Sequence, residues 1–155
     1  MNVRLDAVDW KILKELQEDG RMTNVELARR VGITAPPCLR RVRALEEAGV
    51  IRAYRAVLDE HRLGYDISAF AMVSLHSQSD ADLRAFEARM AEWEIVRHAW
   101  LMSGDIDFIL ECVAPTLSAF HVFVLDHLVA VENVDTVRTA LTIREAKQAP
   151  RIPID

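Results

Sequence analysis

A glycine followed closely by a pair of prolines constrains the first third of this chain more strongly than any other feature. Gly32 comes directly after an apolar helical pattern, and glycine most readily takes the left-handed backbone at which many helices end. Pro36 and Pro37 lack a backbone N–H, which costs least in the first turn of a helix. This spacing predicts two short helices joined by a tight turn within residues 23–54.

The first helix of the pair should begin at Thr23 and end at Gly32. The Thr23 hydroxyl can accept hydrogen bonds from free backbone N–H groups, and Glu26 stands where it would complete a capping box. The apolar face of this helix comprises Leu27, Ala28 and Val31.

The second helix should be capped by Thr34, and its apolar residues form one narrow stripe of Cys38, Val42 and Leu45. At about 100° per residue, the opposite side carries Pro36, Arg40, Arg43, Ala44 and Glu47. A short helix with arginines opposite its core stripe matches a recognition helix for the DNA major groove. A solvated surface with no further role is the alternative, because Arg/Glu-rich helix faces are usually that.

The charge of the chain is divided unevenly, which favours the DNA hypothesis. The formal net charge is −5, but residues 1–55 hold 11 Lys+Arg against 8 Asp+Glu, a net charge of +3, and residues 56–155 hold 8 against 16, a net charge of −8. Between residues 29 and 55 only Glu46 and Glu47 oppose seven arginines: Arg29, Arg30, Arg40, Arg41, Arg43, Arg52 and Arg55. Concentrated basic charge is expected of a phosphate-binding surface.

The segments on either side complete an N-terminal module. A further helix is expected before the pair, capped near Asp6, ended at Gly20 and carrying the stripe Leu5, Val8, Ile12, Leu13 and Leu16. Residues 51–58 are predicted to form an extended linking strand, and residues 59–65 a linker. We therefore expect a DNA-binding domain over 1–58, this linker over 59–65, and a second domain over 66–155.

After the linker, the apolar pattern changes from helical to alternating. Residues 67–75 alternate as in a strand, and Phe70 and Met72 make the second face of that strand partly apolar as well. Two more strands are predicted over 96–102 and 108–113, around the hairpin-forming cluster Ser103-Gly104-Asp105.

Two amphipathic helices and a last strand complete the second domain. One helix is expected over 79–93, and another opens at Pro115 with Leu117, Phe120, Val124 and Leu128 on one face. Val137, Leu141 and Ile143 then alternate with polar residues in a final strand. The order β-α-β-β-α-β predicts a ferredoxin-like sandwich whose two helices cover one face of a four-stranded sheet. The other face is too apolar to stay exposed if it carries Phe70 and Met72, so a dimer is expected.

Three strings occur in order along this pattern: VGITAPPCLRRVRALEEAGVIRAY, SGDIDFIL and VRTALTIREAKQ. On these motifs the chain resembles, over essentially its whole length, the Lrp/AsnC (leucine-responsive, feast/famine) family of bacterial transcription regulators. The resemblance implies an α+β fold, in which a winged helix-turn-helix of three helices is joined by a linking strand to a ferredoxin-like domain. It also implies an effector that is an amino acid or related metabolite, and homodimers that commonly assemble into octamers.

The resemblance also implies sites. It makes residues 35–48 the recognition helix and assigns phosphate contacts to Arg52 and Arg55, so the expected DNA-binding set is Thr23, Thr34, Ala35, Pro36, Arg40, Arg41, Arg43, Arg52 and Arg55. The effector should bind between subunits near the hairpin, at Met102, Ser103, Gly104, Asp105 and Asp107, with Thr136 and Arg138 as a weaker opposite wall.

The chemistry of the hairpin suits an amino acid, although Gly-Asp is also an ordinary turn. Gly104 would let a ligand approach the backbone closely, and nearby N–H groups could hold a carboxylate. Either Asp105 or Asp107 could meet an ammonium group. Asn133 stands where relatives often have Pro-Gly before the last strand, and a left-handed turn is expected there.

The sequence also bears on enzyme activity and metal binding. Ferredoxin-like domains also occur in enzymes, but no nucleophile elbow or phosphate-binding glycine loop is present. His121 and His127 fall on different faces of a helix, and His61, His76 and His98 have no neighbouring ligand cluster. We therefore expect no enzyme activity, no cofactor and no metal. An architectural, nucleoid-associated DNA-binding protein with little ligand response is the alternative function.

Cysteine usage and hydropathy bear on localisation. Cys38 and Cys112 each lie inside an apolar pattern and far apart in sequence, so buried reduced thiols are expected. No apolar run approaches the roughly 20 residues of a membrane span, and residues 1–10 carry charge where a signal peptide would be apolar. We expect a cytoplasmic protein.

Overall fold

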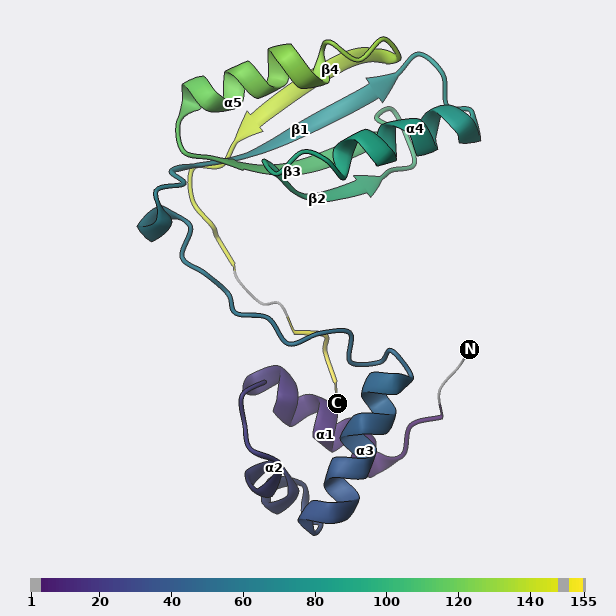
Figure 1. Ribbon diagram of the computed structural model, residues 1–155, viewed down its shortest axis with the longest axis vertical. Helices are drawn as coiled ribbons and strands as arrows, with labels where there is room; N and C mark the ends of the chain where they lie inside the picture. The colour runs from purple at the N-terminus through teal and green to yellow at the C-terminus, as the bar shows by residue number, and fades with distance from the viewer. Residues whose placement is uncertain (1–3, 148–150, 155) are drawn as a thin grey trace. The chain divides into compact units, whose positions relative to one another are not determined.

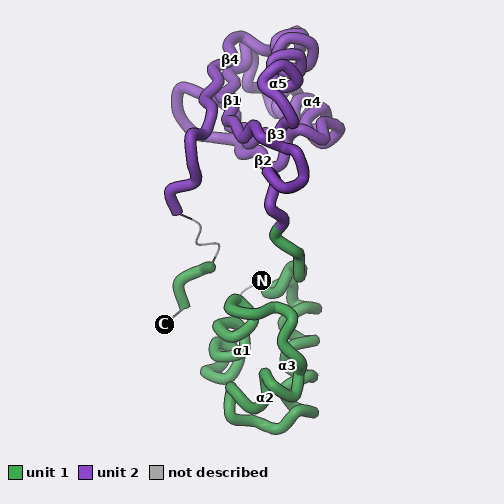
Figure 2. Tube along the Cα trace, turned by 90° about the vertical axis from the view of Figure 1, so that its left-hand side faces the viewer, with its two compact units in different colours: residues 1–57, 148–155 green, residues 58–147 purple. Residues whose placement is uncertain are grey.

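The computed structural model describes residues 4–147 and 151–154 (Figure 1). The chain divides into two compact units (Figure 2): one comprises residues 1–57 with the C-terminal segment, and the other comprises residues 58–147. The C-terminal segment was expected in the second domain, but its described part, residues 151–154, contacts the first helix of the chain.

The first unit contains three helices, α1 (Ala7–Glu18), α2 (Asn24–Val31) and α3 (Ala35–Glu47), as the apolar spacing predicts. Six residues form its buried core, namely Ile12, Leu27, Ala28, Val31, Cys38 and Leu45. Gly32 ends α2 with a φ of 79°, in the left-handed region that favours glycine. The proline pair lies in the first turn of α3, where no intrahelical donor is lost.

The helix starts differ in detail from the expectation. Asp6 forms a full capping box with Asp9. Thr23 accepts from the backbone N–H of Glu26 at 3.2 Å, but the Glu26 side chain does not close the box because Arg29 and Arg30 bind its carboxylate. The expected cap by Thr34 is wrong, because its side chain makes no capping hydrogen bond.

No strand is assigned to residues 51–58 in the single chain, so the predicted linking strand has no ladder partner within the described residues. The linker that follows forms a 3-10 turn, His61–Leu63. Glu60 Oε1 accepts a hydrogen bond from Arg97 Nη1 at 2.5 Å, which holds the start of this turn against residue 97 of the same unit.

The second unit has the predicted order, β1 (Ile67–Leu75), α4 (Asp80–Met90), β2 (Val96–Leu101), β3 (Phe108–Ala114), α5 (Leu117–Phe123) and β4 (Val134–Leu141). The sheet is antiparallel in the order β2-β3-β1-β4, and α4 and α5 cover one face (Figure 1). Alternate residues of β1, from Ala69 to Leu75, are buried under these helices with Phe108, Leu110 and Phe120. The fold is the predicted α+β ferredoxin-like sandwich.

The helix after β3 departs from its predicted face. Leu117 is 40% exposed, whereas Phe123 and Leu128 are buried. Leu117 is the first residue of α5, and a π-helical segment, Val124–Leu128, continues that helix. Its wider turn places residues five apart on one side, so Phe123 and Leu128 share the core side.

The last strand is displaced from its predicted position. It begins at Val134 and stops at Leu141, opposite Ala69 near the start of β1. Thr142 still donates its N–H to the Ser68 carbonyl at 2.9 Å, but Ile143 beyond it is 99% exposed. Asn133 has no left-handed backbone; instead its side-chain amide pairs with both main-chain groups of Ser77 at 3.0 Å.

Both cysteines are free and buried, as expected. Burial raises the pKa of the Cys38 thiol, and burial together with the nearby Glu111 carboxylate raises the pKa of Cys112 to about 12. Among the residues that the structure describes, no helix has the length and apolar character needed to cross a membrane.

Candidate DNA-reading and effector sites

The outer face of α3 carries the side chains expected to read DNA. Pro36, Arg40 and Arg43 are all exposed, on the side opposite the buried Cys38 and Leu45. This arrangement follows from the helical period of the core stripe.

Leu39 is a residue of this face that the sequence reasoning missed. Its side chain is 39% exposed, and at about 100° per residue it lies beside Pro36 and Arg43. The sequence contains an indication of this exposure, because Leu39 falls outside the apolar stripe of Cys38, Val42 and Leu45. An exposed leucine between arginines adds apolar contact area to an otherwise cationic face.

Arg41 belongs to the same helix but does not face outward. Its Nη1 donates to Asp9 Oδ1 at 2.7 Å and to Asp6 Oδ2 at 2.8 Å. The Asp9 backbone N–H and the Arg41 guanidinium hold the pKa of Asp6 below its ordinary value. The guanidinium of Arg41 therefore ties α3 to the first turn of α1.

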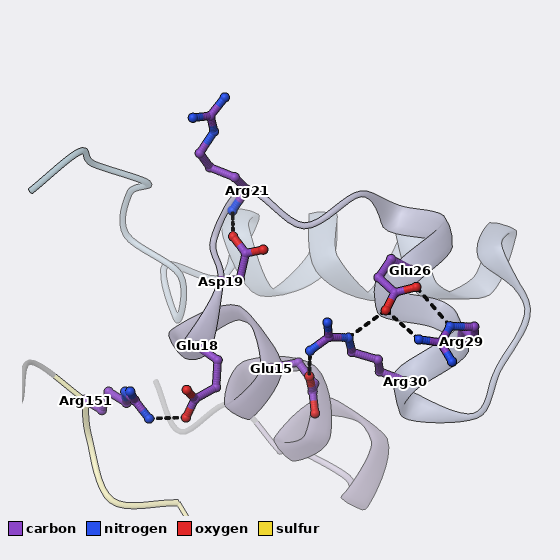
Figure 3. A network of polar contacts seen from close by, with 8 residues as sticks. All are labelled: Glu15, Glu18, Asp19, Arg21, Glu26, Arg29, Arg30 and Arg151. Carbon is purple, nitrogen blue, oxygen red and sulfur yellow. Dashed lines mark hydrogen bonds and ion pairs between the residues drawn. The ribbon is translucent and has the colours of Figure 1, made fainter.

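Arg29 and Arg30 are likewise engaged, in a network on α1 and α2 (Figure 3). Arg29 Nη2 lies 2.7 Å from Glu26 Oε1, and Arg30 bonds both Glu26 and Glu15. Hydrogen bonds from Arg29 and then Arg30 lower the pKa of Glu26 to about 2. The seven-to-two excess of arginines in residues 29–55 thus overstates the available charge, because acids outside that window pair with three of them.

Four of the seven arginines between residues 29 and 55 remain for DNA. Among residues 4–147 and 151–154, no ion pair is formed by Arg40, Arg43, Arg52 or Arg55. All four are exposed. The first two lie on α3 and the other two follow it, so the unpaired arginines of residues 29–55 all lie on α3 or after it.

The starts of α2 and α3 are held together. Asn24 Nδ2 donates to the Ala35 carbonyl at 2.8 Å, which joins the first residues of the two helices. Thr23 and Thr34, which immediately precede these residues, are both exposed. The start of α2 presents backbone N–H groups and partial positive charge, whereas the first turn of α3 keeps only the N–H of Ala35 because Pro36 and Pro37 have none. With the two threonine hydroxyls, this corner is suited to a phosphate oxygen.

Tyr54 fixes the chain between Arg52 and Arg55. Its ring lies against the α1–α2 connection, where a Cβ added to Gly20 would stand 3.2 Å from Tyr54 Cδ1. Burial and the neighbouring Glu46 carboxylate raise the pKa of Tyr54 to about 12. The two arginines therefore extend from an anchored segment.

The hairpin between β2 and β3 has the predicted turn. Gly104 has a φ of 125°, and the Met102 N–H closes the hairpin onto the Asp107 carbonyl at 2.8 Å. Ser103, Gly104 and Asp105 are exposed at its tip.

The two acids of the hairpin have different surroundings. Asp107 Oδ2 accepts the Leu75 backbone N–H at 2.7 Å and lies 3.4 Å from Gln78 Nε2, so it fastens the hairpin to the end of β1. Asp105 contributes its backbone carbonyl, which accepts from Ser74 Oγ at 3.2 Å. Its carboxylate has no hydrogen bond or ion pair among the described residues.

The register places the weaker effector candidates at the same end of the sheet as the hairpin. Thr136 lies opposite Ser74, and Arg138 lies opposite Met72. Ser74 is therefore the link between the hairpin and the start of β4. Thr136 is near the hairpin end, whereas Arg138 lies farther along the face that no helix covers.

That uncovered face has an apolar centre. Phe70 and Met72 are half-buried, and Trp100, opposite Ile109 on the neighbouring strand, is 46% exposed. His98 stacks on Trp100 with ring centres 5.7 Å apart, and its Nδ1 lies 2.8 Å from Glu111 Oε2. No group of His, Cys, Asp or Glu suited to a metal ion occurs in the described part of the chain.

Comparison with known proteins identifies the class. Residues 5–52 match the model of a winged helix-turn-helix DNA-binding domain, and residues 68–152 match the Lrp/AsnC ligand binding domain. A DNA-reading unit and a ligand-binding unit on one chain define a transcription regulator.

Full-length relatives give the family. The chain is 64% identical over 154 residues to the leucine-responsive regulatory protein of Rhizobium meliloti (strain 1021), covering 99% of both chains. It is 37% identical over 150 residues to that of Escherichia coli (strain K12), covering 97% of this chain and 92% of the relative. The protein belongs to the Lrp/AsnC family of DNA-binding transcription regulators.

Solved structures of similar proteins support the same family. A transcriptional regulator from Neisseria meningitidis in complex with L-Met is 35% identical, with a TM-score of 0.92 over 98% of each chain. An AsnC family transcriptional regulator from Agrobacterium tumefaciens is 32% identical, with a TM-score of 0.88 over 96% of this chain and 97% of that one.

Proposed function

We propose that this regulator reads operator DNA with the outer face of α3 and takes an L-amino acid at the hairpin end of its sheet. The DNA-binding part of this proposal rests on a difference among the arginines of α3. Arg41 is bound to Asp6 and Asp9, whereas Arg40 and Arg43 are exposed without an ion pair in the described chain.

Base reading is assigned to Arg40 and Arg43, with Pro36 and Leu39 supplying apolar contact. Arginine pairs with guanine in the major groove, and apolar side chains contact the thymine methyl group. Arg52 and Arg55 are assigned to phosphates, together with the helix starts at Thr23 and Thr34 and the adjacent Ala35. Phosphate contacts give affinity without sequence information.

The effector is proposed to be an amino acid, in keeping with the L-Met complex of the Neisseria relative and the leucine-responsive relatives. Asp105 is the acid available for its ammonium group, because Asp107 is used by the fold. Gly104 leaves room at the turn, while Met102, Ser103 and Thr136 surround the same end of the sheet.

The working assembly is proposed to be a homodimer formed through the uncovered sheet face. Trp100, Phe70, Met72 and Ile109 give that face an apolar centre, which a second copy would remove from water. Two copies on a two-fold axis would present two α3 helices to half-sites about one helical turn apart. Assembly of dimers into an octamer and a cytoplasmic location complete the proposal.

A thermal-shift screen tests the effector half. The L-amino acids, beginning with L-methionine and L-leucine, are added to the wild type, to Asp105→Ala and to Asp107→Ala. A binding amino acid should raise the wild-type unfolding temperature. Asp105→Ala should keep the starting temperature and lose that rise, whereas Asp107→Ala should start lower because it leaves the Leu75 N–H without its partner.

Promoter binding tests whether the protein recognises a specific DNA sequence and whether an amino acid changes that binding. The wild type should bind a fragment of its own control region at least about a thousandfold more tightly than random DNA, and a binding amino acid should change that affinity or the assembly size. A protein that binds all DNA equally and responds to no amino acid would instead be the architectural alternative.

A further inference from the structure

The last described residues of the chain form a specific contact with α1. Gln17 Nε2 donates to the Ile152 carbonyl at 3.1 Å, and Gln17 Oε1 accepts the Ile152 N–H at 2.7 Å. One side-chain amide thus satisfies both main-chain groups of one residue, as a neighbouring strand would. Beside it, Arg151 forms an ion pair with Glu18 (Figure 3).

The sequence of this C-terminal tail, residues 151–154, favours the contact. Pro153 disfavours helical backbone in the residue before it, so Ile152 is held extended with both main-chain groups available to Gln17. Ile152 directs its side chain to solvent and is 72% exposed, whereas Ile154 is half-buried. The tail therefore has one polar anchor and one apolar anchor.

The contact is specific but not tightly packed. A cavity of about 210 Å³ remains along the seam, lined by Lys14, Gln17, Glu18 and the tail. Arg151 and Glu18 are both about half exposed, and exposed ion pairs contribute little to stability. These features suit a contact that opens and closes rather than a permanent part of the core.

The path of the chain gives the contact its meaning. The chain leaves the DNA-binding unit after Val57, forms the whole sensing unit, and then returns with its last residues. We propose that the face of α1 formed by Lys14, Gln17 and Glu18 is a docking surface for the C-terminal tail of the same chain. Docking gives the DNA-binding unit a second attachment to the sensing unit, besides the linker.

The second attachment starts from the strand that ends the sensing unit. β4 ends at Leu141, and the tail that binds α1 begins at Arg151. A tethered segment has a high effective concentration at its own site, so weak contacts suffice to hold it. The docking does not depend on the identity of the effector or on Asp105. An experiment can therefore disprove the docking without disproving the effector site, and the reverse.

Chemical cross-linking of the full chain tests the docking. Lys14→Cys and Ile152→Cys place thiols on either side of the seam while keeping Gln17 and the main chain of residue 152. Cys38 and Cys112 are buried, so a bismaleimidoethane linker should join only the introduced pair. The expected product is a cross-link within one chain, which runs as a monomer on a denaturing gel and carries the mass of one linker bonded to both thiols by intact-mass and peptide mass spectrometry. A product of double mass would assign the tail to a partner chain, and absence of any product would remove the docking; either overturns the proposal.

Two controls connect the cross-link to the observed contacts. Adding Gln17→Met, which keeps the length of the side chain but removes both hydrogen bonds, should lower the yield several-fold. Glu18→Arg or Arg151→Glu alone should also lower it, and the two together should restore it, because a pair that interacts is not additive. A yield unaffected by Gln17→Met and by both charge reversals would contradict the docking geometry.

Cutting the linker in the cross-linked full-length protein tests whether the tail attaches the sensing unit to α1. A protease site inserted between Asp59 and Tyr65 allows the linker to be cut. The two fragments should stay joined on a denaturing gel after cutting, and should separate in chains that carry only one introduced cysteine. Separation in the doubly substituted, cross-linked protein would show that the tail does not bridge to α1.

Discussion

Arg41 Nη1 donates to Asp9 Oδ1 at 2.7 Å, so one arginine of the recognition helix is bound to the first turn of α1. Its neighbour Arg40 is exposed on a different side of the same helix. Adjacent residues of one type therefore have different tasks, because one step along a helix rotates the side chain by about 100°.

Substitution should separate these tasks. Arg41→Gln should lower the unfolding temperature by several degrees and weaken binding to all DNA sequences alike. Arg40→Gln should leave the unfolding temperature unchanged and relax base preference at one position by about 1–3 kcal/mol. Thermal unfolding and binding to a set of single-base operator variants measure both. Loss of base preference in Arg41→Gln at unchanged stability would return Arg41 to the reading surface.

The stability of the N-terminal unit should depend on pH through Glu26. Its pKa is about 2 in the folded chain, against 4.5 for an unperturbed Glu. A carboxyl whose folded pKa is depressed stabilises the fold fully above its unfolded pKa, and that contribution is lost as pH falls from about 4.5 toward about 2. Urea midpoints of the wild type should therefore fall more steeply in this window than those of Glu26→Gln. The difference should shrink at high salt, since the group is near the surface; parallel curves would contradict the assignment.

Arg52 and Arg55 should determine how strongly DNA affinity depends on salt, and not which sequence the protein prefers. Replacing either with Gln removes one phosphate contact, so the slope of log affinity against log salt should flatten by about 1. Affinity for specific and random DNA should fall by the same factor. Fluorescence anisotropy over a salt series measures this, with Arg62→Gln in the second unit as a control that should leave the slope unchanged.

Leu39 should detect a thymine methyl group. Replacing the contacted thymine by uracil removes one methyl group, worth about 0.8 kcal/mol and so about fourfold in affinity. The wild type should show this loss at one position of each half-site, and Leu39→Ala should be indifferent to the same exchange. A wild type insensitive to uracil at every position would leave Leu39 without a reading role.

Assembly should depend on Trp100. Trp100→Glu places a second carboxylate near Glu111 on the uncovered sheet face, so the dimer should dissociate to monomers in sedimentation experiments. Leu125→Glu, at a position that is 65% exposed on the helical side, should keep the dimer. A dimer that survives Trp100→Glu would place the interface elsewhere.

Much of the fold follows from local patterns. Gly32, the proline pair and the stripe of Cys38, Val42 and Leu45 predict the helix pair because each residue acts on its own turn of backbone. The alternation in β1 similarly predicts a strand with one buried face. The π-helical segment was not predicted, because nothing in the spacing of Phe120, Val124 and Leu128 distinguishes an α-helical turn from a wider one.

The sites were less predictable because they depend on pairing between distant elements. Asp6 and Asp9 precede Arg41 by many residues, and only packing of α1 on α3 shows that they bind it. Asp105 and Asp107 look equivalent in sequence, and the register of β1 and β3 separates them by giving Asp107 the Leu75 N–H. The docking of Ile152 on Gln17 joins the two ends of the chain, which no local pattern indicates.

The burial of the two thiols has a consequence for what this regulator can sense. Peroxides and electrophiles attack the thiolate, and Cys38 and Cys112 have raised pKa values and no exposed sulfur. Cys38 lies in the core behind α3, the helix proposed to read DNA, so oxidation there would disrupt the packing that supports this helix. Both sulfurs are therefore poorly placed to react with oxidants in solution, so neither cysteine is suited to sense them.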